Sequence, residues 1–158
     1  MTSSMALVLG FAIGMIAGLR ALTAPAVVCW AAHLGWVNLQ NSHLAWMGST
    51  SAVAIFSILA LAEIVNDKLP ATGSRLAPPS LGIRSITGAL AGAALAIAAG
   101  QSVLVGIVLG VLGALAGSFV GYYVRHGIVN SLKLPDFPIA LLEDAIAIGC
   151  GLLIVSRF

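Results

Sequence analysis

The chain has 158 residues, of which 60% are hydrophobic and 8% are charged, and its mean hydropathy is +1.10. Soluble domains contain about 45–50% apolar and about 25% charged residues, so this composition excludes a soluble fold and indicates an integral membrane protein. The formal charge of +2 comes without a run of Lys or Arg, which argues against nucleic acid as a partner. At about 20 residues a span, we expect one membrane domain, 1–158, with five or six short helices.

The N-terminal third contains two apolar segments, 5–18 and 24–36, on either side of a polar stretch at 19–23. Thr23 followed by Pro25 is typical of a helix start, which favours a break near Arg20. Each segment is short for a full span, so we expect a broken or re-entrant pair of helices. One long helix across Arg20 is the alternative. A third segment, 45–65, is followed by a polar loop at 71–80.

Three further apolar segments, 83–99, 102–124 and 139–155, complete the predicted bundle, with a loop at 125–138. The middle segment carries a stripe of glycines that lets another helix approach closely: Gly106, Gly110, Gly113, Gly117 and Gly121. The motif Gly-x-Arg-x-x-Thr occurs at 18–23 and again at 82–87, and both threonines are expected to cap helices. The motif suggests two related halves, 5–70 and 78–158, with a chance resemblance as the alternative.

The positive charges predict an orientation. Lys68, Arg75 and Arg84 surround one loop and Arg125 and Lys133 another, so the positive-inside rule puts loops 67–84 and 125–138 in the cytoplasm. With six crossings, seven charged residues then lie toward one side of the membrane: Arg20, Glu63, Asp67, Arg84, Arg125, Glu143 and Asp144.

Six of these charged residues are the candidate site: Arg20, Glu63, Asp67, Arg84, Glu143 and Asp144. An arginine at the centre of an inserted helix costs about 2.5–3.5 kcal/mol on insertion scales, so it requires a partner or water. Carboxylates that meet in a partly dry space could carry a proton or bind a cation, whereas carboxylates facing arginines would form structural ion pairs. The arginines could equally bind an anion or lipid phosphate at helix N-termini, or pair between helices.

Catalytic signatures are absent from the sequence. There is no nucleophile elbow, Walker loop, dinucleotide fingerprint or metalloprotease helix, and the spacing of His33, His43 and His126 suits no zinc site. We therefore expect neither an enzyme nor a cofactor, and the sequence leaves metal binding open. A lipid-modifying enzyme would rest only on the carboxylates and His126.

Two stretches resemble a known family. The run Ala17–Ala26 with Trp30–Trp36, and the run Leu61–Pro70 followed by Arg75 and two prolines, are similar to bacterial membrane proteins called domain of unknown function 4126. The resemblance implies a compact multi-pass protein of the bacterial inner membrane and no established activity.

Two functional hypotheses remain. The first is a small transporter or channel for an ion or small solute, assembled as a homo-oligomer, in which Glu63 and Glu143 line the polar site and Arg20 and Arg84 neutralise or gate it. The second is a non-transporting protein that binds membrane lipid or a partner through the glycine face of segment 102–124. In that case the charges are structural helix–helix pairs.

Overall fold

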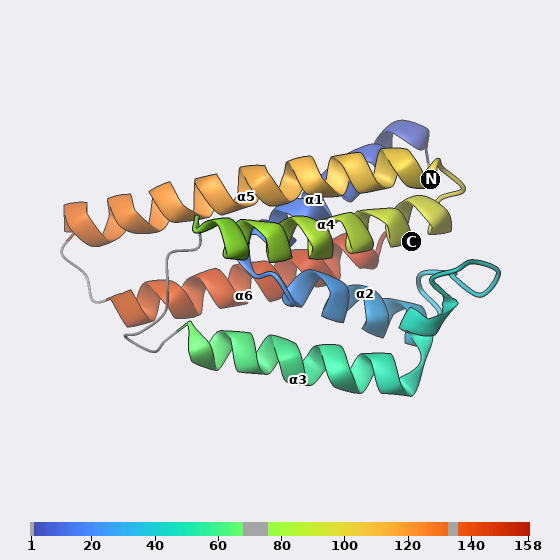
Figure 1. Ribbon diagram of the computed structural model, residues 1–158, viewed down its shortest axis with the longest axis horizontal. Helices are drawn as coiled ribbons and strands as arrows, with labels where there is room; N and C mark the ends of the chain where they lie inside the picture. Colours follow the sequence, from blue (N-terminus) through green and yellow to red (C-terminus); the bar gives the residue numbers. More distant parts are fainter. Residues whose placement is uncertain (1, 68–75, 133–135) are drawn as a thin grey trace.

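The computed structural model describes residues 2–67, 76–132 and 136–158 (Figure 1). These residues form an all-helical bundle with one short 3-10 helix and six α-helices: α1 Ser3–Leu19, α2 Thr23–His33, η1 Ala45–Gly48, α3 Thr50–Asn66, α4 Pro78–Ala98, α5 Val103–Leu132 and α6 Asp136–Val155. The predicted fold class is confirmed.

Successive helices run in opposite directions (Figure 1). Helices α1, α3 and α5 point toward one end of the bundle, and α2, α4 and α6 point away from it. We call this end, where the α1–α2 turn lies, the cluster end. The opposite end, where both chain termini lie, is the terminal end. This arrangement matches the version with six segments, in which the chain turns back near Arg20.

The N-terminal helix pair is broken as predicted. Helix α1 ends at Leu19 because Arg20 is extended, with φ −139° and ψ 105°, and α2 begins at Thr23. At 1.5 Å per residue, the 17 and 11 residues of α1 and α2 give lengths of about 26 and 17 Å, shorter than the hydrocarbon core of about 30 Å. The turn between them therefore lies inside the bundle.

Two other helices are longer than expected. Helix α4 begins at Pro78, five residues before the predicted start, because proline fits the first turn of a helix, where its missing N–H is not needed. Helix α5 continues to Leu132 and α6 begins at Asp136, so the predicted loop 125–138 is wrong over its first eight and its last three residues. Arg125 therefore lies on a helix. Between α4 and α5 the chain turns at Gly100, whose φ of +65° favours glycine.

The glycine stripe of α5 packs inside the chain, against two helices at once. A Cβ on Gly110 would collide with the backbone of Gly88 in α4, and a Cβ on Gly113 or Gly117 would collide with the backbone of α1 around Met15. Between helices in a membrane, such close approach replaces the hydrophobic effect as the source of attraction. The glycine face is therefore filled by α1 and α4, and any association between copies must use another surface.

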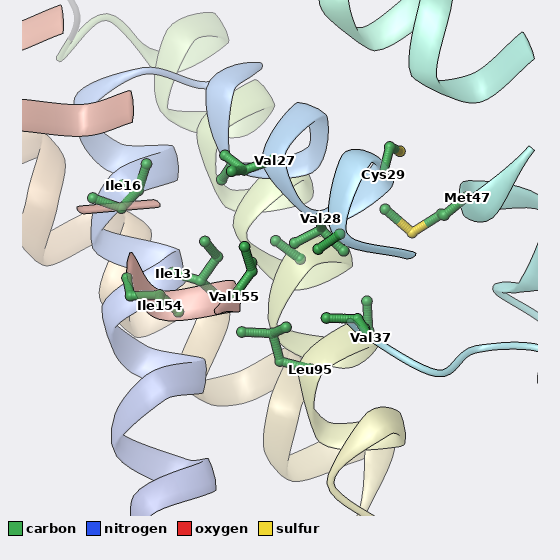
Figure 2. Close-up of a cluster of buried hydrophobic side chains, with 14 of the residues drawn as sticks. Ile13, Ile16, Val27, Val28, Cys29, Val37, Met47, Leu95, Ile154 and Val155 are labelled. Atoms are coloured by element: carbon green, nitrogen blue, oxygen red, sulfur yellow. The ribbon is translucent and has the colours of Figure 1, made fainter. Parts of the chain in front are cut away.

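The apolar core lies between α1, α2, α4 and α6 (Figure 2). Ile13, Val28, Leu95 and Val155 meet there, all fully buried. Large apolar side chains also cover the outward faces of the bundle, among them Ile58 on α3 (65% exposed), Leu104 on α5 (69%) and Leu153 on α6 (62%). Surfaces of this kind require hydrocarbon around them, and three helices are long and apolar enough to span it: 78–98, 103–129 and 137–155.

Candidate functional site

Glu63 joins α3 to the start of α2. Its two carboxylate oxygens accept hydrogen bonds from the backbone N–H groups of Ala21 and Leu22, each at 2.8 Å. These N–H groups immediately precede α2, where a helix has donors without internal partners and the positive end of its dipole. One side chain from α3 thus satisfies two part-buried donors and places its negative charge at the positive end of the α2 dipole.

Arg84, on α4, makes the complementary contacts with the end of α1. Its Nη1 donates to the carbonyl oxygens of Gly18 at 2.5 Å and Leu19 at 2.9 Å, and its Nε donates to Ser80 Oγ at 3.2 Å. The last carbonyls of a helix lack internal donors and form the negative end of its dipole, so a guanidinium stabilises them. Arg84 Nη2 lies 3.9 Å from Glu63 Oε1, so the two capping charges are also neighbours.

The other charges form a closed ring. Arg20 Nη2 lies 2.6 Å from Asp144 Oδ1 and 2.9 Å from Asp67 Oδ2, and Arg125 Nη1 lies 2.9 Å from the same Asp67 oxygen and 3.5 Å from Glu143 Oε2. Because Glu143 and Asp144 are adjacent on α6, these contacts complete a circuit. We call these five residues the ion-pair ring. It links the α1–α2 turn, the end of α3, α5 and α6.

We call the ion-pair ring together with Glu63 and Arg84 the charge cluster. Its members lie within the bundle. Arg20 is 1% exposed and the Asp144 side chain 8%. Arg84 follows Pro78 by six positions and Asp144 follows Asp136 by eight, which places them about 9 and 12 Å along their helices. Removing one partner of a buried ion pair costs about 3–5 kcal/mol, because the other charge is left in a low-dielectric setting.

All six candidate residues from the sequence lie in this charge cluster. Glu143 and Asp144 are about 100° apart on a helix, and accordingly they contact different arginines. The seventh member is Arg125, whose charge in the sequence indicates orientation but does not mark it as a site residue. It follows Gly117 and Gly121 at a spacing of four, so continuing the helical pattern past 124 would have placed it on the glycine face.

The predicted threonine caps are wrong. Thr23 is the first residue of α2 and Leu22 is the N-cap, so the Thr23 hydroxyl is past the capping position. It is buried without a hydrogen-bond partner among the described residues. Thr87 lies inside α4, where its hydroxyl donates to the carbonyls of Ile83 at 3.0 Å and Arg84 at 3.1 Å. The two Gly-x-Arg-x-x-Thr motifs therefore have different structures: the first crosses a helix break and the second lies within one helix.

A cavity of about 190 Å³ opens between α5 and α6 beside the ring. Most of its lining is apolar, for example Val124 and Ile146, and Arg125 and Glu143 are its charged members. Within the residues described, no three His, Cys, Asp or Glu side chains are grouped in a way that could hold a metal ion. The polar chemistry available here is that of carboxylates and guanidiniums.

The fold and the cluster define an all-helical, multi-pass membrane protein with a broken N-terminal helix pair and interior ion pairs. Residues 7–156 match the family described as domain of unknown function (DUF4126), and the chain belongs to that family. No curated protein and no solved structure matches the chain.

Proposed function

We propose that this protein is a small membrane transporter or channel for an ion or small solute, with its polar site in the charge cluster. The observation that carries the proposal is the ion-pair ring beside the non-helical turn from Arg20 to Leu22, inside the bundle. At membrane depth, irregular backbone is tolerated only where it is buried in protein or lines an aqueous cavity. Broken helices of this kind form the ion and substrate sites of many secondary transporters.

Glu143 is the residue that we assign to contact the transported species. Among the ring contacts described above, that between Glu143 Oε2 and Arg125 Nη1 is the longest, at 3.5 Å, and the Glu143 side chain lines the cavity between α5 and α6. Glu63 and Arg84 have a different role, because both hold helix ends. An ion or proton that reaches Glu143 would compete with Arg125 for the carboxylate, and release of Arg125 would alter its shared contact with Asp67.

The test is flux into liposomes that contain the purified protein, with protons, monovalent and divalent cations and small anions as the panel. Wild-type protein should give saturable flux of one member, and Glu143→Gln should lose it. Ile146→Val is the matched control, because it changes the same cavity wall without changing charge, and it should retain flux. Size-exclusion profiles and unfolding midpoints establish that all three proteins are folded. Absence of flux from folded wild-type protein across the panel would overturn the proposal.

The second candidate is a non-transporting membrane protein whose charges hold the helices in register. It is favoured by the close contacts that Arg20 and Arg125 both make with Asp67, and by the capping contacts of Glu63 and Arg84. Under this alternative, no member of the panel crosses the membrane, and neutralising Glu143 changes stability alone.

Because the sequence carries no catalytic motif, we further infer that the protein acts without catalysis. We also infer that it resides in the bacterial inner membrane with its cluster end toward the cytoplasm. The support for this orientation is the charge distribution. Lys68, Arg75 and Lys133 fall in the segments 68–75 and 133–135, outside the described residues. The helices on either side of these segments meet the cluster end, where α3 and α5 end and α4 and α6 begin. The positive-inside rule places such loops in the cytoplasm.

A further inference from the structure

A groove lies at the terminal end of the bundle, distant from the charge cluster. It runs between the connection 38–44 and the seam of α4 and α5, and its volume is about 570 Å³. A second depression of about 340 Å³ adjoins it and shares Asn41, Ser42 and Ile97 with it. Neither depression is lined by a member of the ion-pair ring.

The inner part of the groove is apolar and elongated. Ala89, Ala93 and Ile97 line it from α4 at spacings of four, so they form one stripe about 12 Å long. The two alanines leave space that larger side chains would fill. Val103 and Ile107 form the opposite wall from α5. The stripe is comparable with one leaflet of hydrocarbon, which is about 15 Å, or half of the full core.

The mouth of the groove is polar. The Ser42 hydroxyl is engaged within the connection, where it donates to the Leu39 carbonyl at 2.8 Å and accepts from the Leu44 N–H at 3.2 Å. The Asn41 amide and His43 imidazole are exposed at the rim and can bind a ligand. Among the described residues that line the groove there is no Asp, Glu, Lys or Arg.

We propose that this groove binds a zwitterionic phospholipid, with one acyl chain along the α4 stripe and the headgroup at Asn41 and His43. The polarity of the groove changes along its length as that of a phospholipid does. A polar rim without Lys or Arg offers an anionic headgroup no fixed countercharge, so it favours a headgroup with balanced charges.

The test is native mass spectrometry of delipidated protein titrated with phosphatidylethanolamine or phosphatidylglycerol. The wild type should retain one phosphatidylethanolamine and bind phosphatidylglycerol about tenfold more weakly, equivalent to about 1.4 kcal/mol. Ala89→Phe fills the groove and should weaken retention by a similar factor. Leu104→Phe is the matched control, because Leu104 is 69% exposed and does not line the groove, and it should leave retention unchanged.

Two further variants separate binding from misfolding and test the headgroup contact. Val103→Phe fills the groove from α5, where the side chain is 43% exposed, and should reproduce the loss even if Ala89→Phe does not fold. Asn41→Ala should reduce the preference between the two lipids and leave the total retained lipid nearly unchanged. Equal retention by Val103→Phe and Leu104→Phe, a preference for phosphatidylglycerol, or a lipid-free dimer that the filling variants dissociate would each overturn the proposal.

Discussion

Replacing Glu63 with Gln tests whether the break between α1 and α2 depends on a carboxylate. The wild-type side chain accepts two backbone N–H groups, each at 2.8 Å, one with each oxygen. Glutamine keeps one acceptor oxygen, but its amide nitrogen is a donor and faces the second N–H. The second backbone N–H is then left without an acceptor, which costs about 1–3 kcal/mol. The lost charge at the N-terminus of α2 costs a further 0.3–1 kcal/mol or so. We expect Glu63→Gln to lower the free energy of unfolding by about 1.5–4 kcal/mol.

The assay is equilibrium unfolding in mixed detergent micelles, followed by tryptophan fluorescence. Glu143→Gln is the matched control, because it is the same chemical change in the same charge cluster. Glu143 lies within α6, away from the start of α2. When it is neutralised, Arg125 keeps its contact with Asp67 at 2.9 Å, so no buried arginine is left without a carboxylate and the replacement should cost less. Equal losses of stability in the two variants would refute the capping argument.

A double variant separates capping from ion pairing. Glu63 and Arg84 are 3.9 Å apart, and each makes closer contacts with backbone at the break. We therefore expect the effects of Glu63→Gln and Arg84→Met to be nearly additive, with a coupling energy below about 1 kcal/mol. Recovery of stability in the double variant would show that the ion pair dominates and that the role assigned to the backbone contacts is wrong.

Two further predictions concern packing and orientation. Gly110→Ala should destabilise the bundle by about 1–3 kcal/mol, because the new Cβ would collide with the backbone of Gly88. Gly127→Ala on the same helix is the control, because its new Cβ meets nothing within 4 Å. In the same assay it should be neutral or stabilising by about 0.5–1 kcal/mol. A reporter fused after Phe158 should be active as alkaline phosphatase and non-fluorescent as green fluorescent protein, because the C-terminus lies at the terminal end, opposite the cluster end that we infer to face the cytoplasm. The reverse pattern would contradict the inferred orientation.

The sequence by itself determined the class of protein and the position of its main break. Composition and segment length are local properties that a bilayer constrains strongly, so apolar runs could be assigned as helices without knowledge of their neighbours. The break near Arg20 was also local, because a polar stretch followed by Thr23 and Pro25 ends one helix and starts another. The glycine spacing on α5 predicted close packing for the same reason, although not which helices would fill it.

Only the tertiary structure decided which charges meet. Arg20 contacts Asp67 and Asp144, which are far from it in the chain, and their distances depend on how four elements rotate and where each ends. One such helix end is that of α5, which extends past residue 124 and thereby brings Arg125 into the ring. A buried charge is satisfied by whichever opposite charge or orphaned backbone group the packing places beside it, and sequence spacing within one helix does not encode that neighbour.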